Sequence, residues 1–199
     1  FLVAAAIGWL LETTLIRYLY GRPLDSLLAT WGVSLVLQQA ARSIFGAPNV
    51  EVRAPSWLSG SVGLGIAEVP SARLFILVLA VVAVVGLSLL LKTTAMGRRI
   101  RGVVQNRDLA ETVGISTRST DRLTFFIGSG IAGVAGVAVT LLGSTGPTLG
   151  TSYIVDAFLV VVAGGIGQIR GAVIAAFALG LLQATLEFST TASIAKVNS

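Results

Sequence analysis

The feature that most constrains the fold is an uninterrupted apolar segment at residues 74–91, LFILVLAVVAVVGLSLLL. A helix that crosses the hydrocarbon core of a bilayer needs about 20 mostly apolar residues, and this segment nearly meets that requirement by itself. The whole chain has the same character, since its 199 residues are 54% hydrophobic and only 12% charged, whereas soluble domains carry about 25% charged residues. We therefore expect an all-α, polytopic membrane protein, a helical bundle with room for roughly five or six passes.

Other apolar segments predict further spans, at residues 1–20, 24–42, 123–142 and 171–188. Residues 43–72 hold three prolines and four glycines and are expected to form a substantial loop, with a short strand near residues 49–52. Residues 153–163 are apolar but too few to cross the membrane at about 1.5 Å per residue. Because Gly164 and Gly165 follow them, we predict a broken or re-entrant helix near residues 153–167.

Residues that the sequence lacks exclude several classes of chemistry. Cys and His are absent, which removes thiolate chemistry and the commonest metal ligand, so no metal site and no catalytic residue are predicted. The net charge of +5 does not indicate nucleic-acid binding, because aromatic residues make up only 7% of the chain. No Gly-x-x-x-x-Gly-Lys-[Ser/Thr] motif occurs. Any ATP-driven role would therefore need a partner chain to bind the nucleotide, with no cofactor in this one.

The distribution of basic residues predicts the orientation of the spans. Residues 92–122 contain seven basic and three acidic side chains, a net charge of +4, and short cytoplasmic loops are enriched in Lys and Arg. Placing this segment inside also places Arg17, Arg22 and Arg170 inside, which makes ten of the fourteen basic residues cytoplasmic. Residues 43–72 are then external.

Within residues 92–122, Asp108 and Glu111 have the spacing of a capping box, in which Asp108 would cap a helix and Glu111 would reach back to an orphan amide. Gly114 suits the left-handed position that ends a helix. Together they predict a rigid helix of one to two turns. The segment is either a solvated loop that sets the topology or a docking element for a partner.

Two further patterns concern the spans. Gly128, Ala132 and Gly136 recur every four residues, as in helices that approach each other closely in lipid, and the same pattern occurs one register over at Ser129 and Gly133. We expect ordinary helix packing along this ladder, with a moving seam as the alternative.

Polar groups at membrane depth are costly unless they face protein or water. Thr30, Ser34 and Gln38 form one polar stripe on a helix, and the neighbouring Gln39 points about 100° away. We expect the stripe to line a solute path and Gln39 to bond a neighbouring helix. The peptide groups around the predicted break are candidates for the same path, which then also includes Gly164, Gly165, Gly167 and Gln168.

Several segments in the same order carry a resemblance to a known family. They are GRPLDSLLATWGVSLVLQQAARSIFGAPNVEV, GRRIRGVVQNRDLAETVGI, GSGIAGVAG and GPTLGTSYIVDAFLVVVAGGIGQIRGAVIAA. Together they resemble the permease subunits of the branched-chain amino acid/urea ABC importers. Residues 21–39 are most similar to the urea permease. Members of the family have further helices, so we expect this chain to be a fragment of a single transmembrane permease domain that spans residues 1–199.

The resemblance implies a heteromer in a bacterial inner membrane. A second homologous permease subunit, two cytoplasmic ATPase subunits and a periplasmic solute-binding protein would be the partners, together with the lipid bilayer. The family's ATPase-coupling segment corresponds to residues 101–114 here. Its expected contributors are Arg101, Gln105, Asn106, Arg107, Asp108, Glu111 and Gly114.

The mechanism so implied is ATP-driven alternating access for urea or a related small polar solute such as a branched-chain amino acid. A passive channel or an ion-coupled secondary transporter for a neutral solute is the alternative. A coupled transporter often shows intramembrane ionisable residues in a relay, and only Asp156, Glu12 and Glu187 are available here. A scaffold without transport would leave the predicted break unexplained.

Overall fold

The computed structural model of the 199-residue chain describes residues 1–19, 23–46, 48, 50, 51, 55, 58, 60–64, 67–165 and 167–197. The chain divides into two compact units, Phe1–Pro147 and Thr148–Ser199. Three described helices are long and apolar enough to cross a membrane, namely Ser71–Thr93, Thr117–Thr140 and Ile169–Leu186. The predicted all-α polytopic fold is confirmed.

The first unit begins with helix α1 (Leu2–Thr14) and the 3₁₀ turn η1 (Ile16–Tyr18). The predicted helix over residues 1–20 therefore ends six residues early. The hydroxyls of Thr13 and Thr14 both donate to the carbonyl oxygen of Leu10, at 2.9 and 2.7 Å. Such local bonds compete with the backbone ladder, and they weaken the helix at this point.

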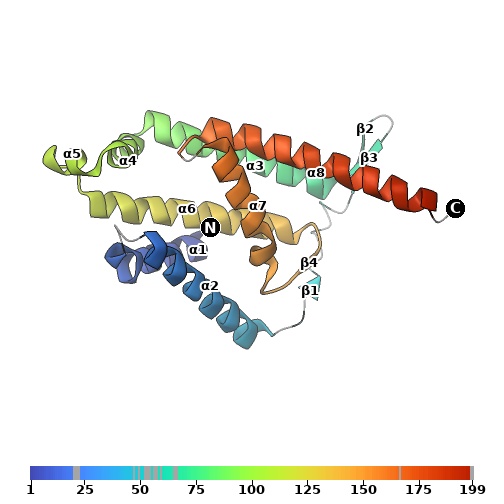
Figure 1. Ribbon diagram of the computed structural model, residues 1–199, viewed down its shortest axis with the longest axis horizontal. Coiled ribbons are helices and arrows are strands. Elements are labelled where there is room, and N and C mark those ends of the chain that lie inside the picture. Colours follow the sequence, from blue (N-terminus) through green and yellow to red (C-terminus); the bar gives the residue numbers. More distant parts are fainter. Residues whose placement is uncertain are drawn as a thin grey trace. The chain divides into compact units, whose positions relative to one another are not determined.

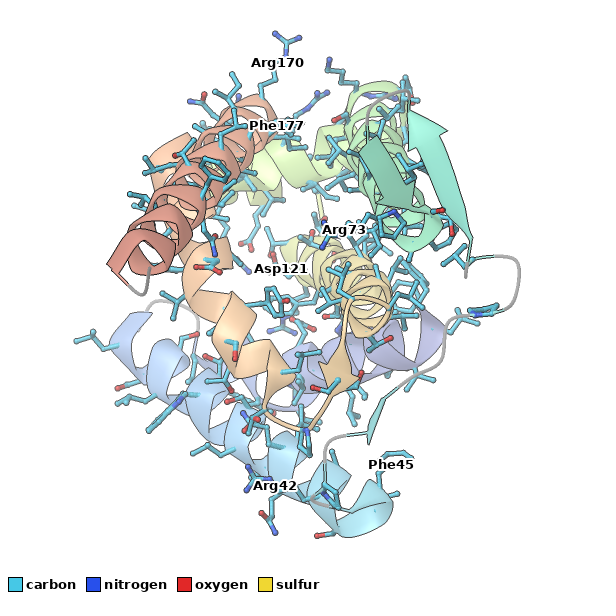
Figure 2. All side chains as sticks on the ribbon, turned by 90° about the vertical axis from the view of Figure 1, so that its right-hand side faces the viewer. Arg42, Phe45, Arg73, Asp121, Arg170 and Phe177 are labelled. Carbon is cyan, nitrogen blue, oxygen red and sulfur yellow. The ribbon has the colours of Figure 1, made fainter. Side chains whose placement is uncertain are left out.

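Helix α2 (Pro23–Phe45) follows and matches the predicted helix over residues 24–42. Pro23 occupies the first helical position, where its missing N–H costs nothing, and Asp25 lies in the first turn, where the helix dipole favours an anion. The chain leaves the helix at Gly46, which has a φ of 93°. Arg42 and Phe45 mark this end of α2 in Figure 2.

The first unit contains two long apolar helices, α3 (Ser71–Thr93) and α6 (Thr117–Thr140). They are connected by α4 (Ala95–Gln105) and α5 (Arg107–Thr112), which lie in succession at one end of the pair (Figure 1). α6 also packs along α1. No residue of α3 is buried within the chain, which leaves its apolar surface for lipid or for other helices.

Two short antiparallel strand pairs complete the first unit. β1 (Val50–Glu51) pairs with β4 (Ser144–Thr145), so that Val50 lies opposite Thr145. β2 (Ser61–Leu64) pairs with β3 (Ala67–Pro70), and β3 leads directly into α3. The predicted strand near residues 49–52 is confirmed for its two central residues, and positions 49 and 52 lie outside the described residues.

The second unit consists of α7 (Leu149–Gly164) and α8 (Ile169–Val197), which pack against each other. The 16 residues of α7 span about 24 Å at 1.5 Å per residue, less than the roughly 30 Å of a hydrocarbon core. Arg170 and Phe177 project away from α8 (Figure 2), and Phe177 is 68% exposed. The predicted break between two helices is confirmed.

Candidate functional site

The predicted cytoplasmic segment, residues 92–122, contains two short helices where the sequence predicts one. The additional helix, α4, begins after Thr94, whose side chain accepts a hydrogen bond from the amide of Gly97 at 3.0 Å. A Cβ at Gly97 would lie 2.2 Å from the carbonyl oxygen of Leu91, so the tight connection from α3 to α4 requires glycine. The signal for this helix in the sequence is a Thr cap ahead of a run in which basic residues alternate with Ile100 and Val103.

The capping residue of α5 is Asn106, and the predicted capping box at Asp108 is wrong. The Asn106 side chain accepts a hydrogen bond from the amide of Leu109 at 3.0 Å. Asp108 instead lies in the first turn, where a carboxylate is favoured by the helix dipole. The physical reason is that Asn caps as well as Asp, and Asn106 has the extended backbone of a cap, with φ −156° and ψ 109°. The predicted length and end of the helix are confirmed, because α5 has six residues and Gly114 has a φ of 80°.

Side chains at both ends of α5 join it to α6. At its start, the Arg107 guanidinium lies 2.7 Å from the Asp121 carboxylate in an ion pair. At its end, the hydroxyl of Thr117 donates to the Glu111 carboxylate at 2.6 Å. Thr117 is 4% exposed and Ala110 is also 4% exposed, so the contact between the two helices excludes water. The predicted role of Glu111 in a capping box is therefore replaced by this bond across to α6.

The exposed side chains of this segment include three aliphatic ones among polar and charged ones. Leu109 is 63% exposed, Val113 75% and Val104 73%. These three aliphatic side chains lie on α4, on α5 and directly after α5, in a segment with exposed basic residues on α4, and exposed apolar side chains of this kind suit a protein partner. Of the other residues assigned to coupling, Arg101 and Gln105 lie exposed on α4.

Helix α1 packs along α6 through small residues. A Cβ added at Gly8 would lie 1.9 Å from the Ser129 hydroxyl oxygen, and one at Gly133 would lie 2.4 Å from the Ala4 Cβ. Gly130 is equally close to the ring of Phe1, so the two backbones approach as small residues allow in lipid. The contact between α1 and α6 therefore lies along the side of α6 that carries Ser129 and Gly133.

The predicted ladder of Gly128, Ala132 and Gly136 lies on an exposed side of α6. A Cβ added at Gly128 or Gly136 would meet nothing within 4 Å. The contact with α1 is therefore offset from the ladder, because a shift of one residue on a helix rotates the contact by about 100°. Packing of this ladder against a helix outside the described residues stays a prediction.

An ion pair closes the contact between α1 and α6. Glu12 is 1% exposed, and its carboxylate oxygen Oε2 lies 3.4 Å from Nε of Arg122. Within the part of the chain that the structure describes, neither atom has a hydrogen-bond partner. The Arg122 side chain is 37% exposed. Nothing in the local sequence around Glu12 or Arg122 predicts the pair, since 110 positions separate them.

The predicted polar stripe lies on α2. Thr30 donates to the carbonyl oxygen of Ser26 at 2.9 Å, and Ser34 donates to that of Trp31 at 2.7 Å. Both hydroxyls are therefore bonded within their own helix. Ser34 and Gln38 are half-buried, and Thr30 and Gln39 are exposed. The stripe exists as a surface of α2, and its role as a path stays a prediction.

The predicted break falls in the second unit. Gly165 and Gly167 have φ values of 88° and 85°, which side-chain-bearing residues rarely adopt. A Cβ at Gly171 would lie 1.7 Å from the carbonyl oxygen of Gly164, so these glycines allow α7 and α8 to cross closely. Gln168 is exposed, and its backbone carbonyl oxygen accepts a hydrogen bond from the amide of Ala172 at 3.0 Å. The structure therefore gives Gly164 a packing role, and lining of a path by these residues stays a prediction.

The part of the chain that the structure describes contains no group of three or more acidic, Cys or His side chains placed to hold a metal ion. The arrangement is suited to transmitting a movement from one helix to the next. A capped helix with an exposed Leu109 is joined at both ends to a long helix, and that helix is packed along another.

Comparison with known proteins identifies the family. Residues 1–197 match the family described as "Branched-chain amino acid transport system / permease component". The chain belongs to this permease family. As a permease component with three described helices long and apolar enough to cross a membrane, it is a multi-pass membrane protein.

Individual relatives are named as amino acid permeases. The chain is 30% identical over 190 residues to the high-affinity branched-chain amino acid transport system permease protein LivH of Salmonella typhimurium. The aligned region covers 92% of the chain and 61% of that protein. The chain is 31% identical over 189 residues to LivH of Escherichia coli, with the same coverage. It is 28% identical over 190 residues to BraD of Pseudomonas aeruginosa. No solved structure matches the chain closely enough to count as a relative.

The chain spans 61% of the length of these relatives. The resemblance to the branched-chain amino acid/urea importers is confirmed at the level of the family.

Proposed function

We propose that the chain is part of the membrane-spanning subunit of an ATP-driven importer for a small polar solute. Two ATPase chains would bind and hydrolyse ATP, a second homologous permease would complete the path, and a periplasmic binding protein would deliver the solute. Family membership supports this arrangement. The sequence itself carries no P-loop, so the nucleotide would bind to the partners.

The observation that carries the proposal is the attachment of α5 to α6. The ion pair from Arg107 and the hydrogen bond from Thr117 hold both ends of a six-residue helix, so a force applied to α5 acts on α6. Exposed Leu109 and Val113 provide the apolar surface for an ATPase groove. Closure of the ATPase dimer would then displace α5 and tilt α6, opening the path alternately to the two sides.

Replacement of Leu109 by Ser tests this role. Removing an exposed apolar side chain costs the folded chain little, yet it removes a central contact with the partner, and such contacts carry most of the binding free energy. We expect solute-stimulated ATPase activity of the reconstituted transporter to fall at least about tenfold, which corresponds to the loss of about 1.4 kcal/mol. Leu24→Ser is the matched control, since Leu24 is 74% exposed at the start of α2.

Normal stimulation with Leu109→Ser would remove α5 from the coupling mechanism. An equal loss in both variants would indicate a general effect of polar substitution.

We propose a branched-chain amino acid as the solute, because the relatives LivH and BraD are named for that transport. Urea is the second candidate. It is supported by the resemblance of residues 21–39 to the urea permease and by a stripe on α2 that carries hydroxyl and amide groups but no charge. Urea needs hydrogen-bond partners and no counter-ion. Uptake of radiolabelled leucine and urea by the complete transporter, each competed by the other, separates the two candidates.

The path itself is tested at the two adjacent glutamines of α2. We expect Gln38→Leu to slow uptake per assembled transporter about tenfold, because the solute loses a hydrogen bond at a dehydrated point, worth about 1.5 kcal/mol. Gln39→Leu should mainly lower the amount of assembled transporter. The opposite pattern would reverse the assignment of the two sides of α2, and unchanged uptake in both variants would exclude this helix from the path.

A further inference from the structure

A polar cavity lies where the apolar parts of α1 and α6 both end. The two helices run antiparallel, so that Glu12, near the end of α1, meets Arg122, near the start of α6. A cavity of about 360 Å³ opens beside this pair. Its lining comes from α1, η1, α5 and α6 and consists of Glu12, Arg17, Tyr18, Arg107, Arg118 and Asp121.

The charges around this cavity do not cancel. Asp121 is engaged by Arg107 at 2.7 Å, and Glu12 faces Arg122 at 3.4 Å. Among side chains that the structure describes, Arg17 and Arg118 have no carboxylate partner. Both carboxylates of the cavity are therefore matched by other arginines, and the charges left over are two guanidinium groups.

The turn η1 holds one of these two groups in place. Ile16 is 6% exposed and anchors the turn, while Arg17 and Tyr18 face outward. The Arg17 guanidinium lies 4.4 Å from the centre of the Tyr18 ring and donates a hydrogen bond to the Tyr18 hydroxyl. The planar group is thus stacked beside the cavity, with N–H groups left over for an anion.

We propose that this cavity binds the phosphate of an anionic lipid headgroup. Guanidinium groups match phosphate oxygens in geometry and charge, and a Tyr ring with an Arg is suited to the level where hydrocarbon gives way to headgroups. Trp9 and Leu10, one turn before Glu12, are 46% and 53% exposed, so acyl chains have an apolar surface beside the site. The position of the cavity favours a lipid over a soluble anion.

The proposal does not depend on the solute or on ATP coupling, because binding is measured directly. The permease in its assembled transporter is purified in detergent and mixed with phosphatidylglycerol or with phosphatidylcholine, and native mass spectrometry counts the lipids retained. We expect phosphatidylglycerol to be retained selectively. Replacing Arg17 and Arg118 together with Gln should weaken its binding about 25-fold, since each basic residue near an anionic surface contributes about five-fold in affinity.

Two control variants separate the effect of these two arginines from a general loss of positive charge. Arg98→Gln with Arg99→Gln removes the same charge from exposed positions on α4, and we expect it to retain the lipid. Arg17→Lys with Arg118→Lys keeps the charge and should recover most of the binding. Equal retention of the two lipids by the wild type, or loss in the α4 control equal to that in the double Gln variant, would overturn the proposal.

A competition experiment with inorganic phosphate shows whether the cavity binds a lipid headgroup or a soluble anion. If phosphate displaces phosphatidylglycerol only at high concentration, the site prefers the lipid. If phosphate binds to the wild type and not to the double Gln variant, while phosphatidylglycerol is not retained, the cavity serves a soluble anion and the lipid assignment is wrong.

Discussion

The buried ion pair between α1 and α6 predicts an asymmetry in stability. The Glu12 side chain is 2% exposed and that of Arg122 is 37% exposed. Replacing Arg122 with Gln would leave a largely buried carboxylate without its counter-ion, a change that costs about 3–5 kcal/mol in buried pairs. Because part of the Arg122 side chain reaches solvent, we expect the cost of Arg122→Gln to lie at the lower end of this range, at about 3 kcal/mol. Glu12→Gln leaves a guanidinium that can still be hydrated, and we expect it to cost only about 1 kcal/mol.

The double variant gives the decisive comparison. With Gln at both positions no unpaired charge is buried, so its stability should lie close to that of Glu12→Gln, which means a coupling free energy of about 2–3 kcal/mol. Unfolding of the purified permease, followed by helical circular dichroism during titration of a mixed micelle with sodium dodecyl sulfate, reports all three free energies. Additive effects, or a larger loss for Glu12→Gln than for Arg122→Gln, would refute the burial of the carboxylate at this contact.

Two more pairs of substitutions test the start of α5 and the packing of α6. Asn106→Ala should remove the α5 cap, worth about 1 kcal/mol, and lower solute-stimulated ATPase activity. Asp108→Ala in the same assay removes only a first-turn carboxylate, worth about 0.3–1 kcal/mol, so it should lower activity less than Asn106→Ala does, and equal losses would contradict the assignment of the cap. Gly133→Leu should lower the free energy of unfolding by about 1–3 kcal/mol through overpacking. Gly128→Leu adds the same volume at an open position, so a comparable loss there would show that the ladder is occupied.

Much of the fold follows from the apolar pattern. Two of the predicted spans fall entirely within helices, residues 74–91 within α3 and residues 171–188 within α8. The span predicted at residues 123–142 ends two residues after α6. The agreement is expected, because a segment that must cross lipid has few alternatives to a helix. The break after Gly164 follows from glycine, since the backbone of Gly165 leaves the helix with a φ of 88°, which side-chain-bearing residues rarely adopt. The pairing of β2 with β3 could not be predicted in this way, because strands of four residues are too short for an alternating pattern to stand out.

The details of the coupling segment are less accessible from the sequence. Asp108 and Asn106 are equally good caps, and the choice between them depends on where the preceding helix, α4, ends. That end is at Gln105, which makes Asn106 the residue between two helices. Glu111 illustrates the same limit, because a carboxylate that can reach back to its own helix can also reach Thr117 on the next one, and the tertiary contact prevails.

The first turns of α6 bring the separate features into one mechanism. Asp121 and Arg122 are adjacent, so their side chains leave the helix about 100° apart. Asp121 holds the start of α5, and Arg122 meets Glu12 of α1. One turn of α6 is therefore fixed to the proposed docking helix on one side and to α1 on the other. A displacement of α5 cannot be absorbed by bending at this point without separating an ion pair, so α1 and α6 would move with it as one body.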